Sequence, residues 1–91
     1  MNKSAAFYIA NLCADIARCV SADRENDEAR YQSSLMRGYT TLSNVRVLKN
    51  WSAYEEGLLL LRGLELAREN ARTADFLKFV NKVAAQLLPL V

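Results

Sequence analysis

The chain has 91 residues, a formal net charge of +2 and a hydrophobic fraction of 52%. That fraction excludes a chain that is disordered throughout, and the length fits a single helical domain spanning residues 1–91. Three glycines and one proline leave few positions for tight turns, while the frequent Ala, Leu, Arg and Glu residues favour helices. The composition therefore predicts an all-α fold.

We do not expect the N-terminal segment to be a leader or a membrane span. Asn11 and Asp15 interrupt the apolar stretch that follows Lys3, and no run approaches the ~18 apolar residues that a span requires. Cys13 and Cys19 stand too far apart on one helix to form a disulfide within it, so we expect two buried thiols. The expected location is cytoplasmic, without a membrane partner.

Two helices are expected in the first half of the chain. Ser4 can cap a helix over residues 4–20, whose apolar face repeats at three- and four-residue steps. Residues 21–28 are polar and predict a connector, with Asp27 among the candidate caps of a second helix over residues 27–42. We expect that helix to end near Asn44, because continuing it would place Leu48 on its polar face. Residues 45–50 alternate and are either extended or a short turn.

Two further helices are expected in the second half. A capping box from Ser52 to Glu55 predicts the start of the third. Its leucines spread around most of its circumference, so it is either the central helix of a bundle or is partly covered by another subunit. The fourth begins near Thr73 or Asp75 and ends before Pro89. No Gly or Pro separates the last two helices, so one long bent helix is the alternative. The short links predict a small up-and-down bundle of about four helices.

Residues suited to catalysis are scarce. The chain has no His, which removes the commonest general base and transition-metal ligand, and its isolated glycines predict no phosphate-binding loop. We therefore expect no enzyme, no metal and no cofactor. Glu65 and Glu69 lie near Arg62, Arg68 and Arg72 along the chain, and a solvated charged strip explains them. The distant alternative is an enzyme that uses acids and arginines on a phosphorylated substrate.

The middle of the chain is basic. Residues 29–54 contain no acidic residue, and polar side chains share the face opposite the apolar stripe of the second helix. Cationic groups neutralise phosphates, amides bond to base edges and aromatic rings stack on bases. The segment is therefore an ordinary solvated face, a DNA- or RNA-binding surface, or a site for an acidic protein. The candidate contacts are Arg30, Arg37, Asn44, Arg46, Lys49 and Trp51.

The third helix carries more apolar surface than one face of a bundle needs. Leu59 and Leu66 are seven residues apart and share a side, with Gly63 between them. A homodimer seam would bury them, and Phe7, which falls outside the apolar face of the first helix, is a candidate to join it. The sequence therefore favours a non-enzymatic helical interaction protein that oligomerises and binds another macromolecule, in the first place a protein.

Overall fold

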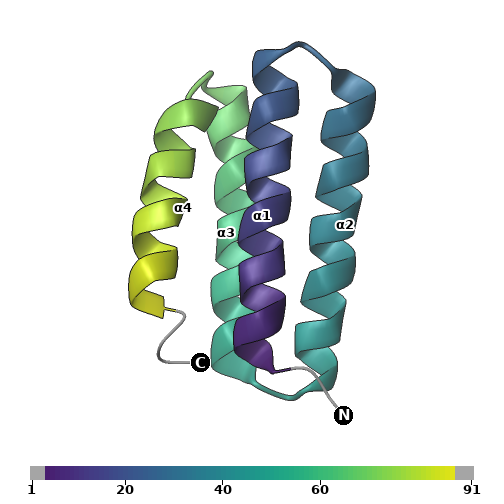
Figure 1. Ribbon diagram of the computed structural model, residues 1–91, viewed down its shortest axis with the longest axis vertical. Helices are drawn as coiled ribbons and strands as arrows, with labels where there is room; N and C mark the ends of the chain where they lie inside the picture. The colour runs from purple at the N-terminus through teal and green to yellow at the C-terminus, as the bar shows by residue number, and fades with distance from the viewer. Residues whose placement is uncertain (1–3, 88–91) are drawn as a thin grey trace.

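The computed structural model describes residues 4–87, and this part of the chain forms four α-helices that run alternately up and down (Figure 1). The helices are α1 (Ala5–Arg24), α2 (Glu28–Val47), α3 (Trp51–Glu69) and α4 (Thr73–Leu87). The prediction of a small all-α, up-and-down bundle is confirmed. Pro89, which was expected to end the last helix, lies outside the described residues.

Helices α1 and α3 occupy the middle of the bundle. Each of them contacts the other three helices, whereas α2 and α4 flank them and do not contact each other (Figure 1). The third helix is therefore one of two central helices. In this arrangement each of the four helices keeps one side in contact with water.

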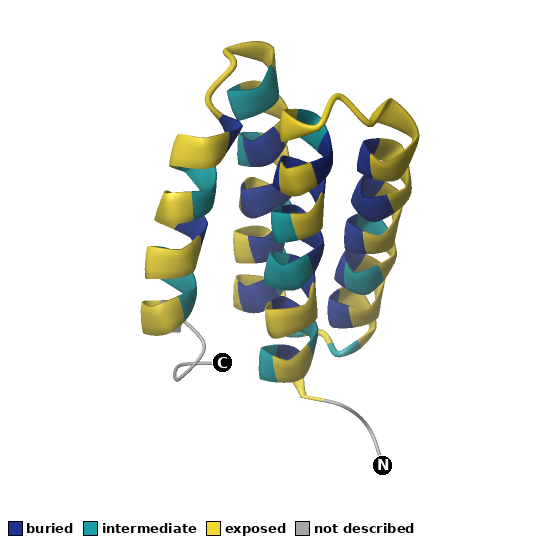
Figure 2. Ribbon diagram, turned by 45° about the horizontal axis from the view of Figure 1, so that its top comes forward, coloured by how far each residue is buried: buried dark blue, intermediate teal, exposed yellow. Residues whose placement is uncertain are grey.

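The apolar stripes of the four helices form one core. In Figure 2, buried residues face inward along each helix and exposed residues face outward. Burying one large aliphatic or aromatic side chain stabilises the fold by roughly 1.5–3 kcal/mol. The largest fully buried side chains are Ile9, Leu12, Ile16, Cys19, Val20, Tyr31, Val45, Leu61, Leu64 and Val80.

Contrary to the expectation from the sequence, helix α1 is long and apolar enough to cross a membrane by length and composition alone, with a mean hydropathy of 1.2 over 18 residues. Core helices of soluble bundles meet the same test. In this fold the apolar stripe of α1 is covered by the other three helices, and Asp15 forms an ion pair with Arg18 at 2.8 Å. The central position of α1 accounts for its apolar character.

Three turns of three residues each join the helices. Their middle residues, Asn26, Lys49 and Ala71, have positive φ angles of 57°, 58° and 56°. This left-handed conformation ends a helix and usually falls on Gly, because a side chain there costs about 1 kcal/mol. The end of α3 is closed by a hydrogen bond from the amide of Arg72 to the carbonyl of Ala67 at 2.8 Å. The alternative of one long bent helix in place of α3 and α4 is therefore wrong.

Because no Gly or Pro stops α1 and α2 where their apolar stripes end, both helices extend further than their sequence patterns suggested. Helix α1 continues to Arg24 instead of ending at residue 20, and α2 continues to Val47 instead of ending near Asn44. Leu48, whose place on the polar side argued against this extension, is the C-cap of α2.

Side chains cap the first three helices. Ser4 and Asp27 accept hydrogen bonds from amides of their own first turns at 3.2 and 3.1 Å, as predicted. Helix α3 is capped by Asn50, whose side chain accepts from the amide of Ala53 at 3.2 Å. The predicted cap, Ser52, lies inside the first turn, so the capping box is wrong by two residues.

Candidate interaction surfaces

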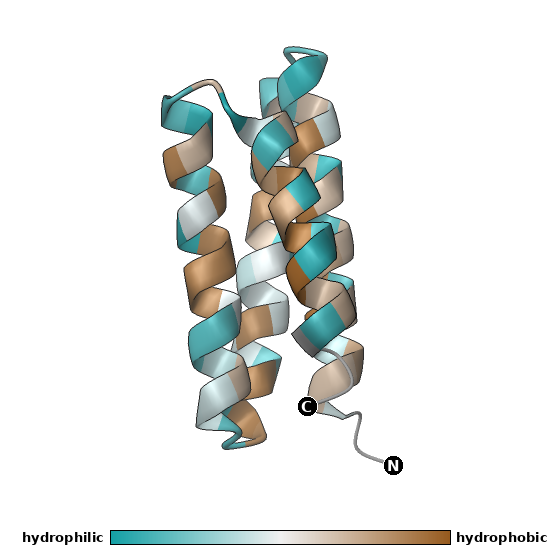
Figure 3. Cartoon of the chain, turned by 90° about the vertical axis from the view of Figure 1, so that its left-hand side faces the viewer, coloured by the Kyte–Doolittle hydropathy of each residue, from teal (hydrophilic) through white to brown (hydrophobic). Residues whose placement is uncertain are grey.

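An apolar face lies along the seam between α3 and α4. Gly63, Leu66 and Phe76 line a hollow there. Leu59, one turn before Gly63 on α3, and Phe79, whose ring is next to that of Phe76, extend it. We call these five residues the α3/α4 face. Leu59, Leu66 and Phe79 expose 65%, 60% and 55% of their surface. Figure 3 shows the bundle from the α4 side, with hydrophobic segments on the helices. Exposed apolar groups that cluster in this way are typical of interaction sites.

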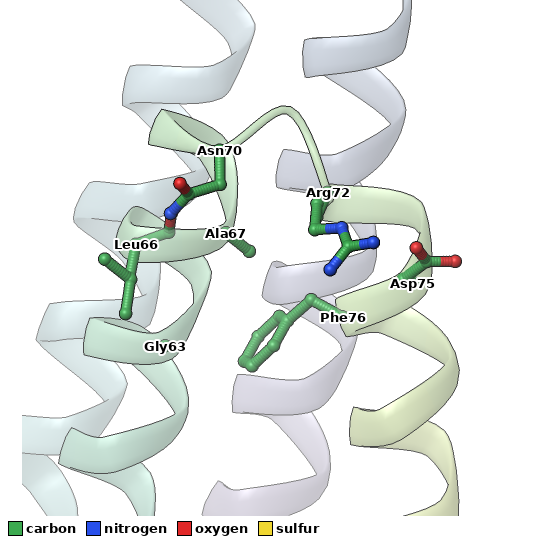
Figure 4. A pocket seen from close by; sticks show the side chains of 7 residues that line it. All are labelled: Gly63, Leu66, Ala67, Asn70, Arg72, Asp75 and Phe76. Carbon is green, nitrogen blue, oxygen red and sulfur yellow. The ribbon is translucent and has the colours of Figure 1, made fainter.

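Gly63 allows Phe76 to lie directly against α3. A Cβ atom at Gly63 would lie 2.7 Å from Cε1 of Phe76, closer than atoms can approach. The Phe76 ring points across the seam toward Gly63 and Leu66 (Figure 4), and its centroid is 6.0 Å from that of Phe79. The packed ring forms the floor of an open groove, which becomes polar toward the α3–α4 turn at Asn70, Arg72 and Asp75.

Sequence analysis missed Phe79. It follows Phe76 by three residues and sits outside the buried stripe of α4, next to fully buried Val80. Phe79 has the same signal as Leu59 and Leu66, because each is a large apolar residue outside the core stripe of its helix. What the sequence lacked was the pairing of α4 with α3.

A polar groove runs along the surface where α1 packs against α2, on another side of the bundle. This α1/α2 groove combines two adjoining hollows that share Arg18 of α1 with Ser33 and Arg37 of α2. Sequence analysis did not group Arg18 with the basic residues of the second helix, because the two are far apart along the chain. The remaining residues that line the groove are Asn11, Asp15, Ser21, Arg30, Ser34, Met36, Thr40 and Thr41.

Phe7 does not join the α3/α4 face. It shares one side of α1 with Asn11 and Arg18, at steps of four and seven residues, and both of these line the α1/α2 groove. Its ring meets that of Tyr8 edge-on, with centroids 5.4 Å apart. Of the predicted contact residues, the structure brings together Leu59, Gly63 and Leu66 only.

The predicted anion contacts do not form one surface. Arg30, Arg37 and Asn44 share a side of α2 at seven-residue steps, whereas Arg46 lies about 160° around the helix from Arg30. The other two lie beyond the end of α2. Lys49 is the left-handed residue of the α2–α3 turn, and Trp51 begins α3, 54% exposed and edge-on to Tyr54 at 6.3 Å.

Arg68 of α3 is the centre of a polar cluster at one end of the bundle. Its Nε donates to Oδ1 of Asp23 at 3.1 Å, and both terminal nitrogens donate to Glu28. Its guanidinium lies 3.7 Å from the centroid of the Tyr31 ring, a cation–π contact. The hydroxyl of Thr73 donates to Oδ2 of Asp23 at 2.9 Å. The cluster therefore ties all four helices together.

Ionisation within the cluster follows from these contacts. The hydrogen bond from Arg68, aided by one from Gln32, lowers the pKa of Glu28 to about 2. The same pairing with Glu28 raises the pKa of Arg68, and burial raises the pKa of Tyr31 to about 12. Glu28 and Arg68 remain charged and paired at neutral pH, which suits a structural role.

Glu65 and Arg68, which the sequence placed in one charged strip of the third helix, have different partners in the fold. Glu65 accepts from the Tyr39 hydroxyl at 2.8 Å, while Arg68 pairs with Asp23 and Glu28 instead of with the acids of its own helix. Among residues 4–87, no group of three His, Cys, Asp or Glu residues is placed to hold a metal. Both thiols are free, with Cys13 only half-buried. Burial raises the pKa of each, to about 11 for Cys19.

The chain matches no protein-family model, no curated protein and no solved structure. Its function is therefore inferred from the two surfaces themselves.

Proposed function

We propose that this protein is a non-enzymatic helical interaction protein that self-associates through the α3/α4 face. The observation that carries the proposal is the exposure of Leu59, Leu66 and Phe79 on two neighbouring helices. Each leaves more than half of its surface in water. Removing apolar surface from water stabilises an assembly by roughly 25 cal/mol per Å².

Charge supports a second copy of the chain as the occupant of this face. Helix α3 exposes an excess of acid: Glu55, Glu56 and Glu69 against Arg62, whereas Glu65 is turned toward Tyr39 of α2. Helix α4 exposes an excess of base: Lys78 and Lys82 against Asp75. A two-fold axis parallel to the helices places α3 of each copy against α4 of the other. The acidic helix then meets the basic one twice, in the self-complementary manner of a symmetric dimer.

The size of the face predicts a weak dimer. Helix α4 is about 22 Å long, and two helices side by side are about 20 Å wide. The face thus covers roughly 450 Å² in projection, compared with about 800 Å² per partner in a standard interface. Association is expected to depend visibly on protein concentration, with monomer at the lowest concentrations.

Sedimentation or light scattering over a concentration series tests the proposal. The mass should rise with concentration from 10.2 kDa toward twice that value. The double variant Leu59→Glu with Leu66→Glu should remain a monomer with an unchanged helical spectrum, because both side chains are exposed and the core is untouched.

Helix α2 offers the matched control. Met36 and Val47 are 71% and 78% exposed, and Met36→Glu with Val47→Glu adds the same charge outside the face. This variant should associate as the original protein does. A monomer at every concentration, or equal loss of association in both double variants, would refute self-association through α3 and α4.

A further inference from the structure

The α1/α2 groove holds more hydrogen-bond donors than its own residues use. Arg18 donates from one terminal nitrogen to Asp15 at 2.8 Å, and Arg30 is paired with Glu25 at 2.8 Å and with the Ser21 hydroxyl at 3.1 Å. A guanidinium has five N–H donors. Most of the donors of these two arginines therefore remain open to a ligand.

Arg37 is the uncompensated charge of the groove. Within residues 4–87 it forms no hydrogen bond or ion pair. It lines both hollows together with Arg18 and Ser33. Because Asp15 balances Arg18 and Glu25 balances Arg30, the groove is left with an excess of one positive charge, located at Arg37.

A second and independent observation is the hydroxyl of Ser34. Its residue is 6% exposed, it lines the hollow with Arg18 and Arg37, and no residue in the described part of the chain bonds to that hydroxyl. Among the described residues only the Tyr31 hydroxyl is both fully buried and without a partner, so the Ser34 hydroxyl still reaches the groove and is free to donate a hydrogen bond there. A ligand oxygen in the groove would accept that hydrogen bond in place of water.

We infer that the α1/α2 groove binds a single phosphate group carried by a small molecule. The Arg18 and Arg37 guanidinium groups, one from each helix, face the phosphate oxygens with paired N–H donors, the geometry in which arginine recognises phosphate. Ser34 donates from the floor of the groove, and Ser33 offers a further hydroxyl at its side.

The distribution of charge favours one phosphate over a nucleic-acid strand. Affinity for nucleic acid comes from neutralising several successive phosphates. Here Arg46 lies on another side of α2, while Asp15 and Glu25 offset the cations that flank Arg37. The net positive charge of the groove is thus enough for one phosphate group, whereas its acidic residues disfavour a strand with several phosphates.

The probe for this site is inorganic phosphate, added to the isotope-labelled full chain at constant ionic strength and followed by NMR. The amides of Ser34 and Arg37 should shift saturably. Arg37→Gln should weaken the binding about tenfold, as expected for the loss of a charge-assisted hydrogen bond. Ser34→Ala should weaken it by a smaller factor. Arg46→Gln, which removes the same charge from the same helix, should bind as the original protein does.

Three results would overturn the inference. The first is the absence of saturable shifts in the groove. The second is equal weakening by Arg37→Gln and Arg46→Gln, which would mean diffuse attraction of anions. The third is tight binding of a single-stranded oligonucleotide that both substitutions weaken equally, which would make this side a nucleic-acid surface. Arg37 is exposed and unpaired, so its substitution leaves the fold intact and the comparison valid.

Discussion

The hydroxyl of Tyr31 is an unusual feature of the core, and removing it should stabilise the protein. Tyr31 is 1% exposed, and no residue among 4–87 forms a hydrogen bond with its hydroxyl. Tyr31→Phe keeps the ring, its packing and its contact with the Arg68 guanidinium. It removes only the unpaired polar group.

The expected gain follows from two opposing terms. An unpaired buried hydroxyl costs about 1–3 kcal/mol in lost hydration. Removing the oxygen also leaves a small cavity, which lowers this gain in stability by up to about 1 kcal/mol, because a void of methyl size costs that much. Tyr31→Phe should therefore raise the free energy of unfolding by about 1 kcal/mol. In a domain of this size, that gain raises Tm by about 4–8 °C.

Alkaline pH gives the same substitution a second readout. The pKa of Tyr31 is about 12 in the fold and about 10 in an unfolded chain. As pH rises, the Tyr31 hydroxyl loses its proton in the unfolded chain before it does so in the fold. Ionisation therefore favours the unfolded chain, and the free energy of unfolding decreases as pH rises from 10 toward 12. In Tyr31→Phe this part of the alkaline destabilisation should disappear.

Urea unfolding followed by circular dichroism measures both effects. The control is Tyr39→Phe, which makes the same chemical change where the hydroxyl donates to Glu65 at 2.8 Å. It should lower stability by up to about 1 kcal/mol. A loss of 1 kcal/mol or more in Tyr31→Phe would show that the buried hydroxyl is satisfied, and the reasoning would be refuted.

Two further predictions concern the turns and the polar cluster. Ala71→Gly should stabilise the fold by about 0.5–1 kcal/mol, because Gly adopts the left-handed conformation without a side-chain penalty. The control is Ala10→Gly at an exposed position inside α1, which should cost about 1 kcal/mol; equal losses in urea unfolding would contradict the role of the turn. The carboxyl of Glu28 should titrate near pH 2 by NMR, so its contribution to stability should be lost as pH falls from 4.5 toward 2. Glu28→Gln should remove this pH dependence of stability. A Glu28 titration midpoint near pH 4.5 would mean that Arg68 does not stabilise the charged carboxylate.

The pattern of apolar residues determined the order and approximate extent of the helices, but it left open whether the last two were one long bent helix. Periodicity of 3.6 residues marks which side of each helix is buried, whatever its partner, and local caps such as Ser4 and Asp27 depend on neighbouring residues only. Helix ends were predicted less well, because Asn26, Lys49 and Ala71 adopt a conformation for which the sequence signal is usually Gly.

The candidate surfaces were predicted only where one helix supplies the residues. The exposed leucines of α3 were identified because their seven-residue spacing is a local property. The contribution of Phe79 to that face depends on the packing of α4 against α3, which spacing does not encode. Arg18 and Arg37 line the same groove because α1 packs against α2, and Arg68 pairs with Asp23 and Glu28 because three helices end at the same level. Local spacing fixes which side of a helix is polar, whereas only the tertiary packing brings polar groups from different helices together.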